Sequence, residues 1–194
     1  HTDNRRQRQM CIRDRDLANQ HSLPLVVIEC LALQHRWAND RISTFVLQGM
    51  VDNRSAFAES GVTYIPYVET KRKEASGLLK GWLEHARLCV IDDYPTYYPK
   101  HVLDTALTVI PCEIHVVDSN GFMAMRAQGR DFSTAYSLRR HLHKTIREHM
   151  HEFPKQRPLE GAKDLAQMDP AVVKAIFAQT NTPMTPYELS LIHI

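Results

Sequence analysis

Residues 25–68 read LVVIECLALQHRWANDRISTFVLQGMVDNRSAFAESGVTYIPYV, and this stretch passes from a strand pattern to a helix pattern and back. Residues 25–30 form a short, mostly apolar run, which is typical of a strand buried on both faces of a parallel sheet. Asp40 can cap a helix over residues 40–59, and Gly61 ends it. Residues 62–68 predict a second strand.

The same alternation continues towards the C-terminus. Further apolar runs predict, in order, a helix around residues 78–83, a strand over 88–91, a helix over 102–110 and a strand over 113–117. Pro66 lies inside the second strand and indicates a sheet edge or a strand end. Strands separated by helices of this length predict parallel βαβ units, so the expected fold class is α/β with a Rossmann-like open parallel sheet.

A different pattern follows Gly121. Ser133 can cap a long helix that ends at Pro154, and apolar residues recur along it at spacings of three and four. Its other side carries basic residues, which are Arg139, Arg140, His143, Lys144, Arg147 and His151. Such a side can contact DNA phosphates, dock on another domain or simply be solvated. From residue 155 onward the chain is rich in Pro and polar residues, as expected of an interdomain linker.

Both ends of the chain carry strings that look foreign to a folded protein. Residues 5–15 read RRQRQMCIRDR and residues 189–194 read LSLIHI. Each string matches the in-frame translation of a transposase-based sequencing adapter, in opposite orientations. The alternative is a natural basic arm for nucleic acid or for targeting. The matches predict that residues 1–15 and 189–194 are adapter-derived and that the native insert is 16–188.

The adapter prediction changes the charge balance. Removing five arginines and two aspartates of the first fifteen residues from the 24 basic and 22 acidic side chains leaves 19 and 20. The apparent basicity therefore belongs to the adapter. Cys30, Cys89 and Cys112 lack metal-type spacing, which favours buried thiols in a reducing cytoplasm. No stretch approaches the roughly 20 apolar residues that span a bilayer, so we expect a cytoplasmic protein without membrane contact.

Common catalytic motifs are missing from the sequence. It contains no GxGxxG, GxxxxGK[ST], GxSxG or CxxC. The histidines that could suggest a metal site are His141, His143, His149 and His151. On a helix, residues two apart do not share a face, so we expect no metal here.

Polar residues gather where the predicted strands end. These residues are Glu29, Cys30, Asp92, Asp93, Tyr94, Asp118, Ser119 and Asn120. In open α/β sheets, ligands bind outside the carboxyl ends of the strands. The alternative is that short polar side chains only cap the following helix or turn. Taken together, these residues mark the candidate ligand face.

The order of segments resembles a known family. HSLPLVVIEC, RWANDRISTFVLQGMVDN, VIDDYP, VVDSNG and RDFSTAYSLRRHLHK follow one another as in the N-terminal domain of class II-like deoxyribodipyrimidine photolyases, within the photolyase and cryptochrome family. The resemblance covers about residues 17–158. It implies an antenna domain over residues 16–127 and a helix with linker over residues 128–188. The family's first strand, central in its five-stranded sheet, and its helical FAD domain are expected to be missing.

The resemblance also implies a role for the complete protein. An antenna pigment of the deazaflavin or folate type would pass excitation to reduced FAD, which donates an electron to a pyrimidine dimer in damaged DNA. The candidate pigment pocket is the ligand face, with Tyr94 or Trp37 as a flat wall. The enzyme would be a carbon–carbon lyase and a monomer, and this segment alone is expected to carry no catalytic or flavin-binding residue. The alternatives are a signalling cryptochrome and a free-standing nucleotide-binding α/β protein.

Overall fold

The computed structural model describes residues 3–32, 38–69, 71, 74–118, 123–150, 159–160, 165–166, 168–172 and 174. Within this part the chain divides into two units. Unit 1 comprises residues 1–16 and 88–158, and unit 2 comprises residues 17–87 and 159–194. One of the three boundaries, between residues 16 and 17, falls inside the first helix, α1 (Asp3–His21). None of the described helices is long and apolar enough to cross a membrane. The domain bounds expected from the sequence stay a prediction.

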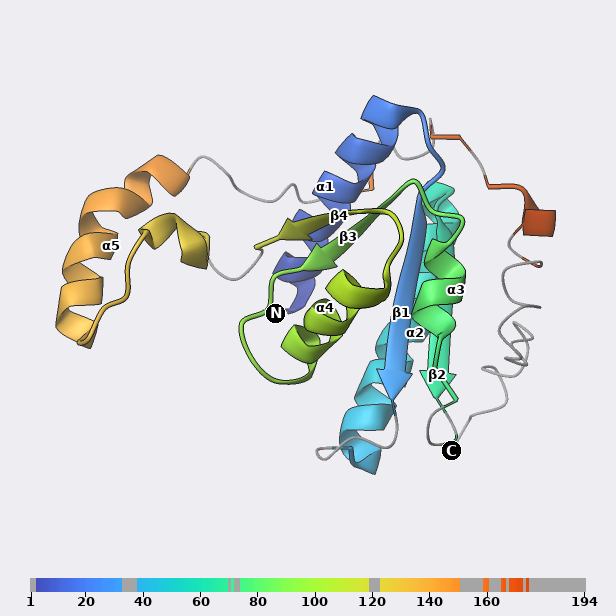
Figure 1. Ribbon diagram of the computed structural model, residues 1–194, viewed down its shortest axis with the longest axis horizontal. Helices are drawn as coiled ribbons and strands as arrows, with labels where there is room; N and C mark the ends of the chain where they lie inside the picture. Colours follow the sequence, from blue (N-terminus) through green and yellow to red (C-terminus); the bar gives the residue numbers. More distant parts are fainter. Residues whose placement is uncertain are drawn as a thin grey trace. The chain divides into compact units, whose positions relative to one another are not determined.

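Unit 2 is built on two parallel strands joined by a long helix. Strand β1 (Val26–Ala32) pairs with β2 (Thr63–Glu69), and α2 (Asp40–Ser60) connects them (Figure 1). The register places Glu29 opposite Pro66. Helix α2 begins one residue earlier than a cap at Asp40 implies, because the Asn39 side chain accepts a hydrogen bond from the backbone N–H of Ile42 at 3.0 Å.

Apolar side chains cover both faces of the β1–β2 sheet. On one face the ring of Phe57 from α2 stacks on Tyr64 at 5.0 Å between centroids. On the other, Tyr67 meets Trp82 of α3 (Leu78–Leu83) edge to face at 5.7 Å, and Leu78 completes this core. Gly61 ends α2 in the left-handed conformation at a φ of 75°, as its place in the sequence predicts.

Unit 1 contains a second parallel βαβ element. Strand β3 (Leu88–Asp92) pairs with β4 (Glu113–Val117), and α4 (Tyr97–Val109) connects them. The expected start of this helix at residue 102 is wrong by five residues. Pro99 stands at the third helical position, where a backbone N–H has no partner within the helix, so proline is tolerated there. Leu103 and Ala106 are the buried side of α4.

Two helical segments follow β4 in unit 1. The 3₁₀ helix η1 (Met125–Gln128) ends at Gly129, and α5 (Ala135–His149) begins after Thr134. The cap of α5 is Thr134 rather than Ser133, because the Thr134 hydroxyl accepts from the backbone N–H of Ser137 at 3.2 Å. The expected end of this helix at Pro154 lies outside the described residues.

The α/β class expected from the sequence is confirmed. Both sheets are two-stranded and parallel, with a helix between the strands. A single open sheet through all four strands stays a prediction, because the described strands pair only as β1 with β2 and β3 with β4.

Candidate functional site

The carboxyl end of β3 is extended by one hydrogen bond beyond the strand. The backbone N–H of Asp93 donates to the carbonyl of Val117 at 2.8 Å, so the pairing with β4 continues through Asp93. The N–H of Tyr94 then donates to the Asp92 carbonyl at 3.0 Å, which turns the chain towards α4. The Asp93 side chain is thereby held at the end of β3, with only 8% of its surface exposed.

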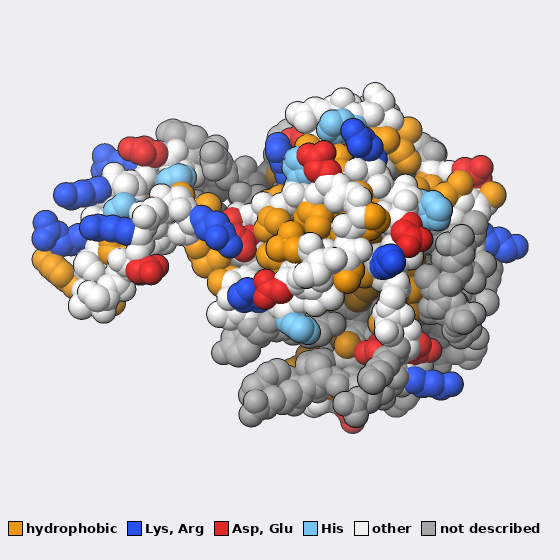
Figure 2. Space-filling model, in the orientation of Figure 1, with side chains coloured by type: hydrophobic (Ala, Val, Ile, Leu, Met, Phe, Trp, Pro, Cys, Tyr) orange, Lys and Arg blue, Asp and Glu red, His pale blue; other side chains and the backbone are white. Residues whose placement is uncertain are grey.

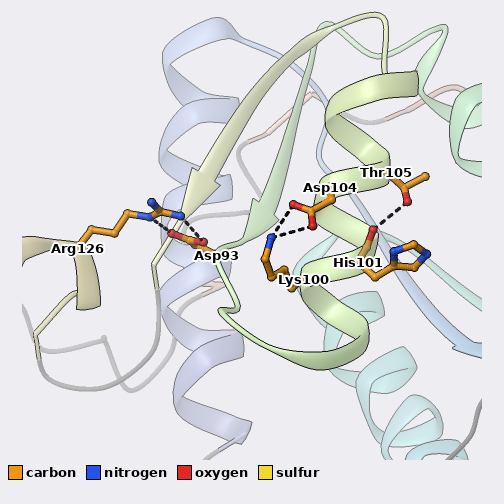
Figure 3. A network of polar contacts seen from close by, with 6 residues as sticks. All are labelled: Asp93, Lys100, His101, Asp104, Thr105 and Arg126. Atoms are coloured by element: carbon orange, nitrogen blue, oxygen red, sulfur yellow. Dashed lines mark hydrogen bonds and ion pairs between the residues drawn. The ribbon is translucent and has the colours of Figure 1, made fainter. Parts of the chain in front are cut away.

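An arginine from η1 closes over this buried carboxylate. Arg126 donates from Nε to Oδ2 of Asp93 at 2.5 Å and from Nη2 to Oδ1 at 3.2 Å (Figure 3). This two-pronged, charge-assisted geometry is stronger and more specific than a hydrogen bond between neutral groups. The hydrogen bond from Arg126 holds the pKa of Asp93 below its ordinary value, with burial opposing it and the charges of Arg126 and Lys100 adding to it. Asp93 is therefore ionised at neutral pH.

The second strand-end aspartate fixes the same arginine segment. Asp118, directly after β4, accepts a hydrogen bond from the backbone N–H of Met125 at 2.5 Å. Asp93 and Asp118 thus hold two consecutive residues of η1, Arg126 and Met125. The cluster of Asp93, Asp118 and Arg126 is called the strand-end clamp below. It positions an exposed guanidinium, since 79% of the Arg126 side chain remains accessible.

The first two turns of α4 lie beside the clamp. Lys100 donates to Asp104 at 2.7 Å, a pair four residues apart on an exposed helical surface (Figure 3). The Thr105 hydroxyl donates to the carbonyl of His101 at 2.8 Å. The charge of Lys100 also reaches Asp93, where it contributes to the lowered pKa. Lys100 and Arg126 thus each pair with one carboxylate, that of Asp104 and that of Asp93. The solvent-facing side of Arg126 is the part suited to an anionic ligand group.

Glu29 has a different role from the one expected at a strand end. Strand β1 continues to Ala32, so Glu29 lies inside the strand. Its Oε2 accepts from the Tyr64 hydroxyl at 2.5 Å and from Nδ2 of Asn53 at 2.9 Å, which ties β1 to β2 and to α2. Burial, followed by the hydrogen bond to Glu29, raises the pKa of Tyr64, so the phenol stays a donor.

Cys30 points to the opposite face of β1 from Glu29. The residue is exposed by surface area, yet the atoms packed around its sulfur raise the pKa of the thiol to about 11, with the Glu29 charge as a smaller cause. Cys89 behaves similarly, because burial and then the nearby Cys112 and Asp14 raise its pKa to about 12. Thiols held protonated in this way are poor nucleophiles and poor metal ligands.

The predicted ligand face is therefore only partly described. Asp92, Asp93, Tyr94 and Asp118 lie together at the strand ends of unit 1, and Glu29 and Cys30 belong to unit 2. Ser119, Asn120 and Trp37 lie outside the described residues. Arg126 was not predicted. The segment between β4 and α5 contains two arginines, Arg126 and Arg130, and the sequence alone does not say which one pairs with a strand-end aspartate.

One histidine of α5, His141, has a packing contact, whereas His143 is exposed. The His141 ring lies 5.0 Å from the ring of Phe132. Within the residues that the structure describes, no three His, Cys, Asp or Glu side chains are grouped closely enough to hold a metal ion.

Comparison with known proteins leaves the family of the chain open. No protein-family model matches it, and no curated protein matches its sequence significantly.

Proposed function

We propose that this chain is a segment of a light-driven DNA photolyase, comprising its antenna α/β domain and the start of the connection to a helical FAD domain. The observation that carries the proposal is the strand-end clamp. Polar residues follow β3 and β4 in the order that the family resemblance requires, Asp92 to Tyr94 and then Asp118, at the edge where α/β proteins bind ligands.

The residues present fit a planar, anionic antenna pigment in two respects. Arg126 exposes guanidinium donors on a side that Asp93 does not use, and these suit a phosphate or carboxylate on the pigment. Tyr94 offers a half-buried aromatic ring next to the clamp, which suits a flat apolar surface. The clamp would orient the pigment, and the pigment would supply light absorption.

In the complete protein, the flavin would belong to a domain beyond this segment. Reduced FAD would supply an electron for the splitting of a cyclobutane pyrimidine dimer, and the dimer would have to leave the duplex to reach it. The contribution of this chain is then to hold the pigment and to connect the two domains. Isolated, it should repair nothing.

The first test is the genomic sequence on both sides of residues 16–188. A photolyase requires a strand upstream and a helical FAD domain downstream. A continuous reading frame that lacks the helical domain would overturn the proposal. Light-dependent loss of cyclobutane dimers from an irradiated oligonucleotide then distinguishes a photolyase from a signalling cryptochrome, which binds FAD and repairs nothing.

The second test addresses the pigment. In the complete protein, Asp93→Ala and Asn120→Ala should lower antenna absorbance while FAD content stays constant. Arg126→Gln should do the same, because it removes the exposed guanidinium and leaves the strands intact. Asp104→Asn, on the exposed surface of α4, is the matched control. Unchanged antenna absorbance in all three variants would exclude the clamp as the pigment site.

A further inference from the structure

One side of α5 concentrates positive charge around an exposed aromatic ring. Tyr136, Arg140, His143 and Arg147 follow at spacings of four, three and four, so they form one row along the helix, and Lys144 lies next to it. This set is called the basic face. All five residues are exposed, and no Asp or Glu occurs between residues 132 and 147. Figure 2 shows Lys and Arg side chains gathered over this helix.

The opposite side of α5 is already in contact with its own unit. Leu138, Leu142 and Ile146 are half-buried on that side. The Thr145 hydroxyl donates to the sulfur of Met123 at 3.5 Å, and Met123 is buried. The ring of Phe132 contacts His141 in the same region. Met123 and Phe132 therefore contact this side of α5 through Thr145 and His141, and the basic face is exposed.

The aromatic ring lies within the basic face rather than beside it. Tyr136 is 67% exposed, and the guanidinium carbon of Arg140 lies 5.9 Å from its ring centroid. Neither packing nor a carboxylate explains an exposed tyrosine among cations. Cations that track phosphates together with an aromatic platform for a base or a sugar are the combination that nucleic-acid-binding surfaces use.

We propose that the basic face of α5 binds the phosphate backbone of a nucleic acid. From residue 136 to residue 147 the helix rises roughly 17 Å, at about 1.5 Å per residue, a length along which duplex DNA presents on the order of ten phosphates. Arginine matches phosphate in a two-pronged geometry, and the face contains two arginines. An anionic bilayer would instead take up the apolar stripe of Leu138, Leu142 and Ile146, whose side chains are half-buried rather than exposed. This surface is separate from the strand-end clamp and requires neither pigment nor flavin.

The test measures binding of the full chain to fluorescein-labelled 20-nucleotide DNA, single-stranded and duplex, by fluorescence anisotropy between 50 and 200 mM salt. The double variant Arg140→Gln/Arg147→Gln should lower the slope of log Kobs against log salt by about two and weaken binding by at least tenfold. Tyr136→Ala should weaken single-strand binding by about fivefold or more, with a smaller effect on the duplex.

Two matched controls remove the same charge elsewhere. Arg41→Gln/Lys80→Gln changes exposed positions of α2 and α3, and should leave affinity nearly unchanged. Arg5→Gln/Arg8→Gln tests the arginine-rich N-terminus. Loss of binding in the N-terminal variant with full binding by the α5 double variant would overturn the proposal. So would binding to anionic vesicles without binding to DNA, or no measurable DNA binding at 50 mM salt. Far-UV circular dichroism of each variant establishes that the helix is retained.

Discussion

The carboxyl of Asp14 should make the protein less stable as the pH rises from 4 to 8. Asp14 lies on α1 with 9% of its surface exposed, and its Oδ1 has no hydrogen-bond partner among the described residues. The neighbouring Arg15 pairs with Asp16 instead, at 2.7 Å. Burial raises the pKa of Asp14 from 3.8 to about 7. A buried carboxyl oxygen without a hydrogen-bond partner is unusual in a native fold.

The size of the effect follows from the pKa change. The folded chain binds this proton more tightly than the unfolded chain does. The stabilising contribution is therefore fully present below pH 3.8 and is lost as the pH rises through about 7. At 1.36 kcal/mol per pKa unit, the total loss is about 4 kcal/mol. Asp14→Asn keeps the shape and removes the charge, so it should add about 4 kcal/mol to the free energy of unfolding at pH 8 and almost nothing at pH 4.

The assay is urea denaturation of both chains at half-unit steps between pH 4 and pH 8. Taking the difference between the two chains cancels the contribution of every other titrating group. Asp52→Asn, at an exposed position of α2, is the control and should change stability by less than about 0.5 kcal/mol. A constant difference between Asp14→Asn and the parent chain at all pH values would refute the reasoning. Removal of residues 1–15 should likewise not lower the melting temperature; a clear loss would show that the segment contributes native packing.

Three further predictions concern the backbone, the clamp and a thiol. Gly61→Ala should destabilise unit 2 by about 1 kcal/mol because the φ of Gly61 is 75°. Gly49→Ala, in the interior of α2 with open space around it, should instead stabilise the protein by about 0.5–1 kcal/mol. Thermal unfolding of both variants measures the two effects, and equal effects would contradict the prediction. Arg126→Gln should raise the pKa of Asp93, because it removes the hydrogen bond that lowers this pKa while the burial that raises it remains. An unchanged pKa of Asp93 in a carboxyl NMR titration would mean that the ion pair does not form in solution. Because the pKa of Cys89 is about 12 instead of 9.0, roughly a thousandfold less of it should be thiolate at pH 8 than for an ordinary cysteine. Alkylation of Cys89 by iodoacetamide should therefore be slow until urea unfolds the chain. Equal alkylation rates with and without urea would contradict this prediction.

Local pattern was sufficient to predict most elements of this fold. Each observed strand begins within one residue of its predicted start, and β4 coincides with the prediction at residues 113–117. Short apolar runs bounded by turn residues define the position of a strand closely. Most errors lie at the ends of elements, and the 3₁₀ helix η1 was not predicted at all. The helix predicted over residues 102–110 begins five residues earlier, at Tyr97, and Pro99 is compatible with its first turn. Strand β1 extends two residues further than predicted, because Leu31 and Ala32 pair with Val68 and Glu69.

The candidate site was predicted less completely than the fold. The strand-end aspartates could be found from their position, since a polar pair after an apolar strand is a local signal. Arg126 could not, because its partner Asp93 is 33 residues away and only the folded chain brings the two together. Glu29 was placed at a strand end for a related reason. Its partners Asn53 and Tyr64 lie 24 and 35 residues later in the sequence, so its role in joining β1 to α2 depends on non-local contacts.

Pro66 affects which edge of the β1–β2 sheet can accept a further strand. The N–H of Thr63 donates to the carbonyl of Leu25, so the odd-numbered residues of β2 bond to β1 and position 66 faces away from it. Because proline has no backbone N–H, position 66 cannot donate a hydrogen bond to a strand added on that side. Along the other edge, the backbone of the even-numbered residues from Val26 to Ala32 points away from β2, and no charged side chain or proline occurs among them. Among the described strands, this sheet is therefore better suited to accept a further strand beside β1 than beside β2. If two such sheets met through β1, each would pair the more favourable edge of the other, which favours a closed pair over a fibre.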